Sequence, residues 1–294
     1  MKENQRNIQT AAADPAAARG SAGLDQETAE LRGLLDAVFE HYGVDFRGYA
    51  FSSLKRRVLR RVMEEKTGTI AGLQQLVVAD LAAMERLLTA LTVHVTAMFR
   101  DPAFYVVLRE QVLPVLRTYP FLRLWVAGCS TGEEVYSLAI LLHEEGLYSR
   151  CRIYATDLRE AVLEKARSGI FPLSVMQEYT LNYQQAGGRG AFAEYYTSDH
   201  EFVIFRSFLR ENVVFAAHNL VSDASFNEFH AIFCRNVMIY FNRALQERAH
   251  QLFKESLINF GYLGLGRSES VRFSNCEHDY EPVSAKERIY RKIK

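Results

Sequence analysis

The chain has 294 residues, of which 49% are hydrophobic, and its 35 Lys and Arg residues balance its 35 Asp and Glu residues. This length holds one large domain or two smaller ones with a substantial core, and the charge balance excludes a general attraction to nucleic acid or anionic membranes. The four cysteines form no CxxC or Cys/His pattern, so we expect neither a disulfide framework nor a metal site. Because no apolar run suits a signal peptide or a membrane span, the expected location is the cytoplasm.

The chain starts with a segment that has almost no large apolar side chains. Residues 1–23 are rich in Ala, Gly and polar residues, which cannot bury enough surface to order, so we expect a disordered tail. Residues 24–95 instead carry apolar side chains at every third or fourth position, beginning with Leu31, Leu34 and Leu35. This spacing is typical of amphipathic helices and predicts an N-terminal all-α domain.

The remaining residues, 96–294, alternate short β-rich runs with helical segments. The runs are RLWVAG, RIYATD, NVVFAAHN, AIFCRN and YLGLG. Helices are expected through Tyr136 and Leu142, from Arg159 and from Arg243. Such alternation specifies a parallel sheet covered by helices on both faces.

One connection in this region is much longer than the others. More than 40 residues separate the helix that ends near Ser168 from the strand at Val213, whereas α/β connections usually have about 2–6 residues. We therefore expect residues 169–212 to form an insertion. Its EFVIFRSFLR segment indicates a small antiparallel β element, and QQAGGRG indicates a flexible loop. The β element fits either a hairpin that caps the sheet or a docking surface for a partner strand.

A glycine turn, GCSTGEE, joins the first strand to its helix at Gly128 to Glu134. A dinucleotide site would show GxGxxG with bare backbone N–H groups aimed at a pyrophosphate. Here two glutamates in the first helical turn would repel a phosphate and attract a cation. A capping box between Thr131 and Glu134 explains one of these acids and leaves the other unexplained.

The second strand ends in Asp157, where an acid commonly accepts hydrogen bonds from ribose hydroxyls. Alternatively, Asp157 caps the helix that follows. A ribose-binding acid beside an acidic turn without phosphate-binding features describes a nucleoside that carries positive charge. S-adenosylmethionine fits this description, because it has a ribose, a sulfonium and an ammonium but no phosphate.

From about Leu24 to its end the sequence resembles the CheR-type chemoreceptor glutamate methyltransferases. Six blocks in order carry the resemblance: LTVHVTAMFRDPAFY, GCSTGEEVYSLA, IYATDL followed by VLEKARSGIFPLS, AAHNL, FCRNVMIYF and GYLGLGRSE. It implies an α/β fold with a Rossmann-like methyltransferase domain, an N-terminal all-α domain and a small inserted antiparallel β subdomain. It also implies methyl transfer from S-adenosylmethionine to glutamate carboxylates of methyl-accepting chemotaxis proteins, which gives methyl esters for sensory adaptation and S-adenosylhomocysteine as product.

The resemblance also assigns functional residues. Its cofactor contacts fall on His94, Thr96, Arg100, Gly128, Glu134, Asp157, Asn219, Leu220, Arg235 and Asn236. It implies that Glu134 lies near the amino end of the cofactor, Asp157 on the ribose, and Asn219 with Leu220 at the adenine edge. Arg100 and Tyr240 are the expected catalytic residues. Arg100 would hold the substrate carboxylate in a bidentate fork and Tyr240 would face the methyl group, although a salt bridge and ordinary packing also explain such residues.

Several positions depart from the family pattern. In the TVHVTAMFR block, Val93, His94 and Met98 replace residues that are usual in the family, and His94 takes the place of an Asn. His230 and Arg267 replace a frequent Asp and a frequent His. These departures mark a divergent subgroup.

A basic helix is predicted in SSLKRRVLRRVMEEKTG, with Leu54, Val58 and Val62 facing inward. The basic residues around its other side are Lys55, Arg56, Arg57, Arg60 and Arg61. Such a run is ordinarily a solvated helix face. The alternative is that it grips an acidic helix, because the corresponding helix of the family is implicated in receptor docking. The expected partners are therefore cytoplasmic chemoreceptor helices, without nucleic acid or membrane insertion.

Three other functions remain open at this level. The chain could bind S-adenosylmethionine as a signalling module without methylating receptors, or it could methylate a different acidic signalling protein. It could also be a nucleotide-dependent oxidoreductase, which the missing GxGxxG and the acidic turn disfavour.

Overall fold

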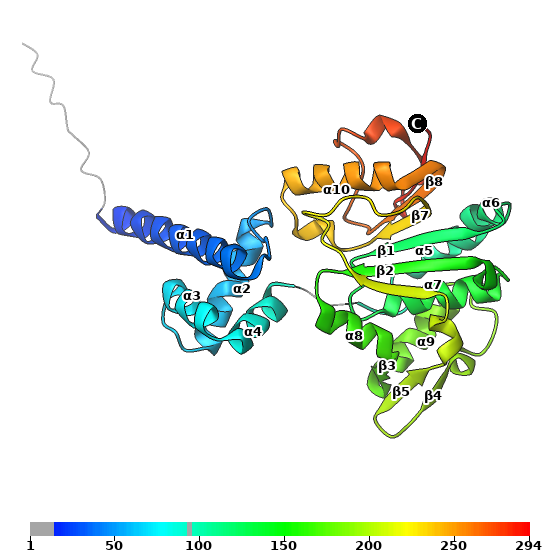
Figure 1. The fold of residues 1–294 in the computed structure, drawn as a ribbon, viewed down its shortest axis with the longest axis horizontal. Helices are drawn as coiled ribbons and strands as arrows, with labels where there is room; N and C mark the ends of the chain where they lie inside the picture. The colour runs from blue at the N-terminus through cyan, green and yellow to red at the C-terminus, as the bar shows by residue number, and fades with distance from the viewer. Residues whose placement is uncertain (1–14, 93–95) are drawn as a thin grey trace, which may run out of the picture. The chain divides into compact units, whose positions relative to one another are not determined.

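The structure is a computed structural model that describes residues 15–92 and 96–294 and divides into two compact units, Met1–Val93 and His94–Lys294 (Figure 1). The helices described in the first unit are α1 (Pro15–Tyr42), α2 (Phe51–Glu64), α3 (Ile70–Ala79) and α4 (Leu81–Leu91). Helices α1 and α2 each pack on α3, with Leu31, Leu34 and Val58 fully buried. The predicted all-α domain is thus confirmed.

Helix α1 begins earlier than the sequence predicts. The expected disordered tail covers residues 1–23, but residues 15–23 are helical, so that prediction is wrong for these nine residues. Residues 1–14 lie outside the described part of the chain. The physical reason is that PAAARGSAG is rich in alanine, which is the strongest helix former.

The second unit is built on a seven-stranded sheet in the order β6-β2-β1-β7-β8-β10-β9. Its strands are β1 (Leu122–Ala127), β2 (Cys151–Asp157), β6 (Val213–Ala217), β7 (Phe229–Cys234), β8 (Leu257–Leu265), β9 (Tyr280–Ser284) and β10 (Ile289–Lys292). The first five are parallel, as predicted, but β10 runs antiparallel to both β8 and β9. The sheet is therefore mixed, and the expectation of a purely parallel sheet is wrong at this edge.

Helices lie on both faces of this sheet (Figure 1). They are α5 (Pro102–Val107), α6 (Leu113–Leu116), α7 (Glu133–Glu144), α8 (Glu160–Ser168) and α10 (Arg243–Ser256), with a π-helical segment at Leu108–Val112. The chain leaves β1 towards β2 but leaves β7 in the opposite direction, towards β8. Right-handed crossovers consequently place α7 and α10 on opposite faces. The strand order reverses between β1 and β7, where open α/β sheets bind their ligands.

The insertion at residues 169–212 contains a second sheet in the order β3-β5-β4, with both pairings antiparallel. Its strands are β3 (Ile170–Pro172), β4 (Tyr196–Ser198) and β5 (Phe202–Phe205), and a helix, α9 (Met176–Gln185), precedes β4. The predicted small antiparallel β subdomain is confirmed. Helix α9 is an addition that the sequence analysis did not predict.

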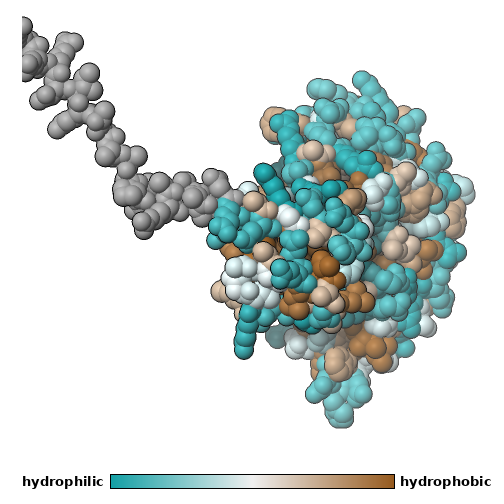
Figure 2. Space-filling view, turned by 60° about the vertical axis from the view of Figure 1, so that its left-hand side comes forward, coloured by the Kyte–Doolittle hydropathy of each residue, from teal (hydrophilic) through white to brown (hydrophobic). Residues whose placement is uncertain are grey.

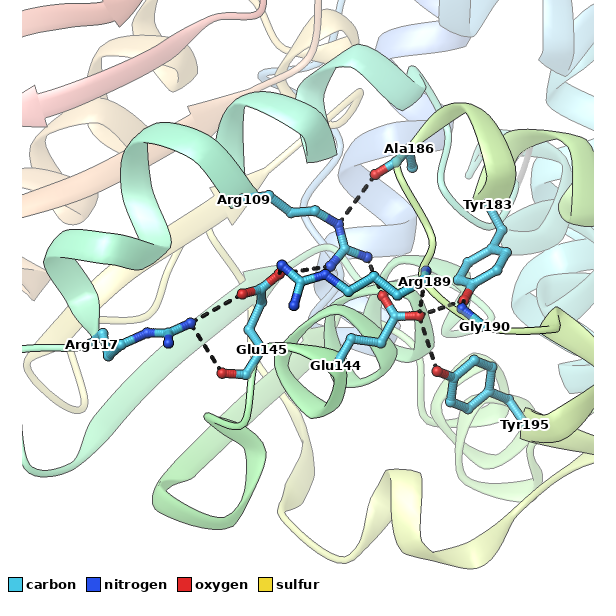
Figure 3. Close-up of polar contacts among 9 residues, drawn as sticks. All are labelled: Arg109, Arg117, Glu144, Glu145, Tyr183, Ala186, Arg189, Gly190 and Tyr195. Atoms are coloured by element: carbon cyan, nitrogen blue, oxygen red, sulfur yellow. Dashed lines mark hydrogen bonds and ion pairs between the residues drawn. The ribbon is translucent and has the colours of Figure 1, made fainter.

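The loop between α9 and β4 is held by buried polar side chains (Figure 3). Glu144, at the end of α7, accepts hydrogen bonds from the hydroxyls of Tyr183 and Tyr195 and from the backbone N–H of Arg189. The hydroxyl of Tyr183 also accepts from the backbone N–H of Gly190 at 3.0 Å. The QQAGGRG segment is therefore pinned to α7, and its interpretation as a flexible loop is wrong.

Three arginines complete this network (Figure 3). Arg109 pairs with Glu144 and, at 2.9 Å, with Glu145. Arg117 and Arg189 also pair with Glu145, at 3.0 and 2.6 Å. Burial alone would raise the pKa of Glu144, but hydrogen bonds from Tyr183 and Arg109 outweigh it and hold that pKa below its usual value. The network thus fastens the β subdomain to the main sheet's helix layer through ionised carboxylates.

We expect Glu144→Gln to destabilise the second unit by about 3 kcal/mol, because buried Arg109 loses one of its two charged partners and keeps only Glu145. Because the folded pKa of Glu144 is depressed, its contribution to stability is present above the pKa of an unfolded glutamate and is lost as the pH falls through the folded pKa. Thermal unfolding between pH 7 and pH 3 measures both effects. Arg189→Ala is the matched control, since this largely exposed arginine should contribute less than about 1 kcal/mol. Equal losses of stability in the two variants would contradict the assignment of Glu144 as the main stabilising carboxylate.

The molecular surface is mostly hydrophilic with scattered apolar patches on the face drawn in Figure 2. Large apolar side chains that reach the surface include Met63 and Leu81. Within the described ranges, no helix combines the length and the apolar character that crossing a membrane requires.

Candidate active site

The predicted site residues of the second unit gather at one edge of the main sheet. Gly128 follows β1, Asp157 ends β2, Asn219 follows β6 and Arg235 follows β7. These strands are parallel, so their carboxyl ends meet at the same edge, beside the point where the strand order reverses.

The glycine turn after β1 has a strained backbone. Gly128 has φ 77°, and a Cβ at this position would come within 2.5 Å of a methyl carbon of Val237. Ser130 also has a positive φ, 51°, and donates its backbone N–H to a carboxylate oxygen of Asp157 at 2.9 Å. Left-handed backbone at a non-glycine residue persists only where its surroundings enforce it. Here the enforcing contact joins the turn to the end of β2.

Asp157 therefore acts differently from a helix cap. Helix α8 has Arg159 at its N-cap position without a side-chain capping bond, so the capping explanation of Asp157 is wrong. Its second oxygen accepts a 3.3 Å hydrogen bond from the backbone N–H of Arg159. The carboxylate lies at the strand end where a ribose would bind.

The two glutamates of the turn have separate partners. Glu133 is buried and accepts hydrogen bonds from the hydroxyls of Thr131 at 2.6 Å and Tyr179 at 3.4 Å. Glu134 instead forms an ion pair with Arg235 at 3.0 Å. The N-cap of α7 is Gly132, with φ 97° and no side-chain capping bond. The capping box of Thr131 and Glu134 is therefore wrong, because a long-range ion pair takes Glu134.

Arg235 connects three segments of the site. Its guanidinium donates to Glu134, to Asp101 at 2.9 Å and to the backbone carbonyl of Arg100 at 2.9 Å. It also lies over the ring of Phe104, 4.1 Å from the ring centroid. Its Nε is buried and has no hydrogen-bond partner among the described residues. Through these contacts Arg235 holds together the start of α7, which carries Glu134, and the turn that carries Arg100 and Asp101.

Arg100 stands in a turn that is strained on both sides. Phe99 and Asp101 have φ values of 50° and 56°. The backbone N–H of Phe99 donates to the hydroxyl of Ser137 on α7 at 2.8 Å, and the carbonyl of Met98 accepts from Asn182 on α9 at 3.1 Å. Arg100 itself is half-buried. The turn thus carries the arginine on a backbone that α7 and α9 fix.

A residue that the sequence analysis did not assign controls the turn after β7. Glu269 is 4% exposed and accepts four backbone hydrogen bonds. The donors are the N–H groups of Gly266 (2.7 Å), Asn236 (2.9 Å), Val237 (2.9 Å) and Ile239 (3.2 Å). Asn236 has φ 61°. In the sequence, Glu269 ends the GYLGLGRSE block, which contributed to the family resemblance but was given no functional role.

Buried carboxylates and arginines lie side by side in this site. Burial raises the pKa of Glu134, and the charge of Arg235 opposes this. Burial also raises the pKa of Glu269, and its four backbone hydrogen bonds oppose it. Glu134 keeps 16% of its side-chain surface exposed, so a ligand at this edge can reach it. Such a site favours a cationic ligand over a phosphate.

The remaining predicted residues of this unit differ in exposure. Asn219 accepts the backbone N–H of Val221 on its side-chain oxygen at 2.9 Å, and Leu220 is buried. Tyr240 ends the short 3-10 helix Met238–Tyr240 and is half-buried, so it is not a core residue. Thr96 is also half-buried. His94, together with Val93, lies outside the described residues.

The basic residues predicted to dock the substrate lie on α2 in the first unit. Lys55 pairs with Glu27 at 2.7 Å, Arg57 donates to the carbonyl of Leu91 at 2.5 Å, and Arg61 pairs with Glu64 and Glu65 at 3.1 and 3.2 Å. These three stabilise the helical unit itself. Arg56 and Arg60 are the exposed members of the set.

Comparison with known proteins gives the class of this site. Residues 94–289 match the family model described as the CheR methyltransferase SAM-binding domain, and residues 29–92 match the CheR methyltransferase all-alpha domain. The two matches meet at the division between the two structural units.

Related proteins agree with this match. The chain is 48% identical to "Putative methyltransferase Cher3" of Pseudomonas putida, over 90% of this chain and 96% of that protein. It is 34% identical to the chemotaxis protein methyltransferase of Listeria innocua, over 78% and 85% of the two chains. It is 32% identical to the chemotaxis protein methyltransferase of Salmonella typhimurium, over 86% of each.

The chain belongs to the CheR methyltransferase family. It is an S-adenosylmethionine-dependent methyltransferase, which excludes the oxidoreductase alternative. The residues at the sheet edge fit this cofactor. The carboxylates of Glu134 and Asp157 would suit a molecule with an ammonium, a sulfonium and ribose hydroxyls, because they accept hydrogen bonds and favour positive charge.

Proposed function

We propose that this chain transfers a methyl group from S-adenosylmethionine to glutamate side chains of chemoreceptors, which gives glutamate methyl esters. The observation that carries the proposal is the cluster in which one guanidinium, that of Arg235, joins Glu134, Asp101 and the backbone of Arg100. This cluster supports an acidic cofactor site beside a second arginine, Arg100, which suits a carboxylate substrate. The related chemotaxis methyltransferases support the substrate class.

The reaction asks little acid–base chemistry of the protein. When bound, S-adenosylmethionine supplies an electrophilic methyl group on a positively charged sulfur. The substrate glutamate has a reference pKa of about 4.3, so its carboxylate is already ionised at neutral pH. A carbon–oxygen bond forms as the carbon–sulfur bond breaks, and no proton moves. The protein therefore contributes orientation and exclusion of water.

Two residues orient the substrate carboxylate in this proposal. Arg100 holds it in a two-point hydrogen-bonded fork, and its turn is rigid because Phe99 and Asp101 are fixed on either side. Tyr240 is half-buried after β7 on the turn that Glu269 fixes, where its hydroxyl orients the attacking oxygen. Glu134 binds the amino end of the cofactor, and Asp157 binds its ribose.

The exposed residues Arg56 and Arg60 are the part of α2 that we propose to contact an acidic receptor helix. Arg60 has 78% of its side chain exposed and pairs with Glu64 at the surface, an interaction that contributes less than about 1 kcal/mol and is readily exchanged for a partner.

We expect the double reversal Arg56→Glu with Arg60→Glu to raise the KM for receptor about tenfold or more, because like charges then face the acidic helix. Affinity for S-adenosylmethionine and thermal stability should stay unchanged, and binding and unfolding assays measure both. The matched control reverses Arg32 and Lys66, which are exposed elsewhere on the same unit. An unchanged KM in the first double variant would restore the solvated-face explanation of α2.

The proposal is tested by mapping the product. The protein is incubated with S-adenosylmethionine and a receptor cytoplasmic fragment, and mass spectrometry of its peptides should locate added methyl groups on glutamate side chains. Methyl groups on another acidic protein from the same cells, with none on receptors, would move the substrate to a different signalling protein. Tight cofactor binding without methylation of either would favour a signalling module. Because the proposed substrates are cytoplasmic receptor helices, we also propose that the reaction takes place in the cytoplasm.

A further inference from the structure

The segment after β8, residues 266–277, exposes an aromatic ring. Phe273 is 84% exposed, the largest exposed fraction among the large apolar side chains of the described residues. Isolated apolar side chains at the surface are ordinary. Phe273 is unusual because its backbone is also strained, with φ 64°, in a conformation that disfavours bulky side chains.

The strain is maintained by hydrogen bonds on both sides of the ring. The backbone N–H of Phe273 donates to Glu277 at 2.8 Å, and that of Arg272 donates to the hydroxyl of Ser270 at 3.0 Å. The N–H of Asn275 donates to Glu247 on α10 at 2.9 Å. These contacts fix the turn in place, so the ring is presented outward by an ordered backbone.

The same segment is continuous with the active site. Its residue Glu269 accepts the backbone N–H groups that set the turn leading to Tyr240. Its residue Arg267 reaches Asp101, at 3.4 Å, which in turn pairs with Arg235. The ring of Phe273 therefore stands on a segment that is tied to the turns of Arg100 and Tyr240.

The segment of the ring also carries two arginines with exposed side chains, one of which, Arg267, pairs with Asp101 and Glu287. Arg267 has 52% of its side chain exposed, and Arg272 is exposed beside Phe273. Ile239, the neighbour of Tyr240, is also partly exposed. Exposed arginines with an aromatic side chain suit an acidic partner that also offers an apolar stripe.

We propose that Phe273, Arg267 and Arg272 form a lip that contacts the acidic amphipathic helix of the substrate next to the glutamate being methylated. The inference rests on the proposed function, because it names a second contact for the same substrate. The ring packs on the apolar stripe of that helix, and the two arginines face its acidic side chains. The lip thus helps to select which glutamate enters the site.

The test uses Phe273→Asn in the full-length protein. Asparagine tolerates positive φ, so this variant removes the ring while relieving the strain, and it should unfold at the same temperature or higher. We expect the KM for receptor to rise about tenfold, with kcat and the Kd for S-adenosylmethionine unchanged. Arg272→Glu should raise the same KM in the same direction.

Phe260→Asn is the matched control. Phe260 also has a positive φ, 66°, and is 51% exposed, but it lies in the first half of β8, which pairs with the start of β7, away from the carboxyl edge. An unchanged KM in Phe273→Asn, or an equal rise in Phe260→Asn, would overturn the lip and leave the proposed function intact. Failure of the unmodified protein to methylate receptor would overturn both.

Discussion

Replacing Arg100 by alanine is expected to lower receptor methylation by about 100-fold or more, because the substrate carboxylate then loses the fork that aligns it. Affinity for S-adenosylmethionine should weaken as well. The charge of Arg100 lowers the pKa of Glu134 and so helps to keep this carboxylate ionised for a cationic ligand. Single-turnover methylation at saturating cofactor, with a separate cofactor titration, separates the two effects. A variant that methylates at the original rate would remove Arg100 from the mechanism.

Two variants accompany that measurement. Arg100→Lys keeps the positive charge but loses the two-point geometry, so an intermediate rate is expected. Arg152→Ala removes an arginine at the start of β2, opposite to Asp157, where its guanidinium makes a long 3.5 Å contact with the carbonyl of Glu211. This control should methylate at the original rate. A loss of activity in Arg152→Ala equal to that in Arg100→Ala would point to a general electrostatic effect.

Glu269→Gln is expected to lower kcat by about 10-fold to 100-fold by misplacing the turn that carries Asn236 and Tyr240. Each carboxylate oxygen of Glu269 accepts two backbone N–H groups. An amide has only one acceptor oxygen, so in either orientation its NH2 group faces two donors. Leaving buried donors unpaired costs about 1–3 kcal/mol each, and the turn should shift to relieve them.

The control for Glu269 is Glu144→Gln, because both carboxylates are buried and accept several hydrogen bonds. Both variants should melt at lower temperature than the original protein. Well below either melting temperature, Glu144→Gln should keep its kcat, whereas Glu269→Gln should not. If kcat falls equally in the two, Glu269 acts only through stability.

Local sequence patterns were sufficient for the parts of the fold that depend on local periodicity. The runs RLWVAG and RIYATD are β1 and β2, and the acidic glycine turn opens α7, because strand and helix periods act over a few residues. The final strands were missed. β9 contains Pro282 and lies at the edge of the sheet, and a proline within a short run hides a strand, although edge strands tolerate it.

The contacts that assemble the site could not be derived locally. Arg235 bonds to Glu134 and Asp101, which lie 101 and 134 residues away in the chain. The capping box was a wrong prediction for this reason. A local pattern offered Glu134 a partner in its own turn, but the ion pair with distant Arg235 takes this side chain. The family resemblance supplied the residues of the site. The structure added how Arg235 and Glu269 hold their segments together.

The reaction that we propose for this protein is the formation of methyl esters on receptor glutamates. The most direct test incubates it with methyl-labelled S-adenosylmethionine and membranes that carry candidate chemoreceptors, and then measures volatile label released by mild base. Esters of a carboxyl group release methanol under these conditions, so base-labile label that depends on Arg100 is the predicted result. Label that stays on the protein after base, or no transfer to any receptor despite tight cofactor binding, would contradict the claim.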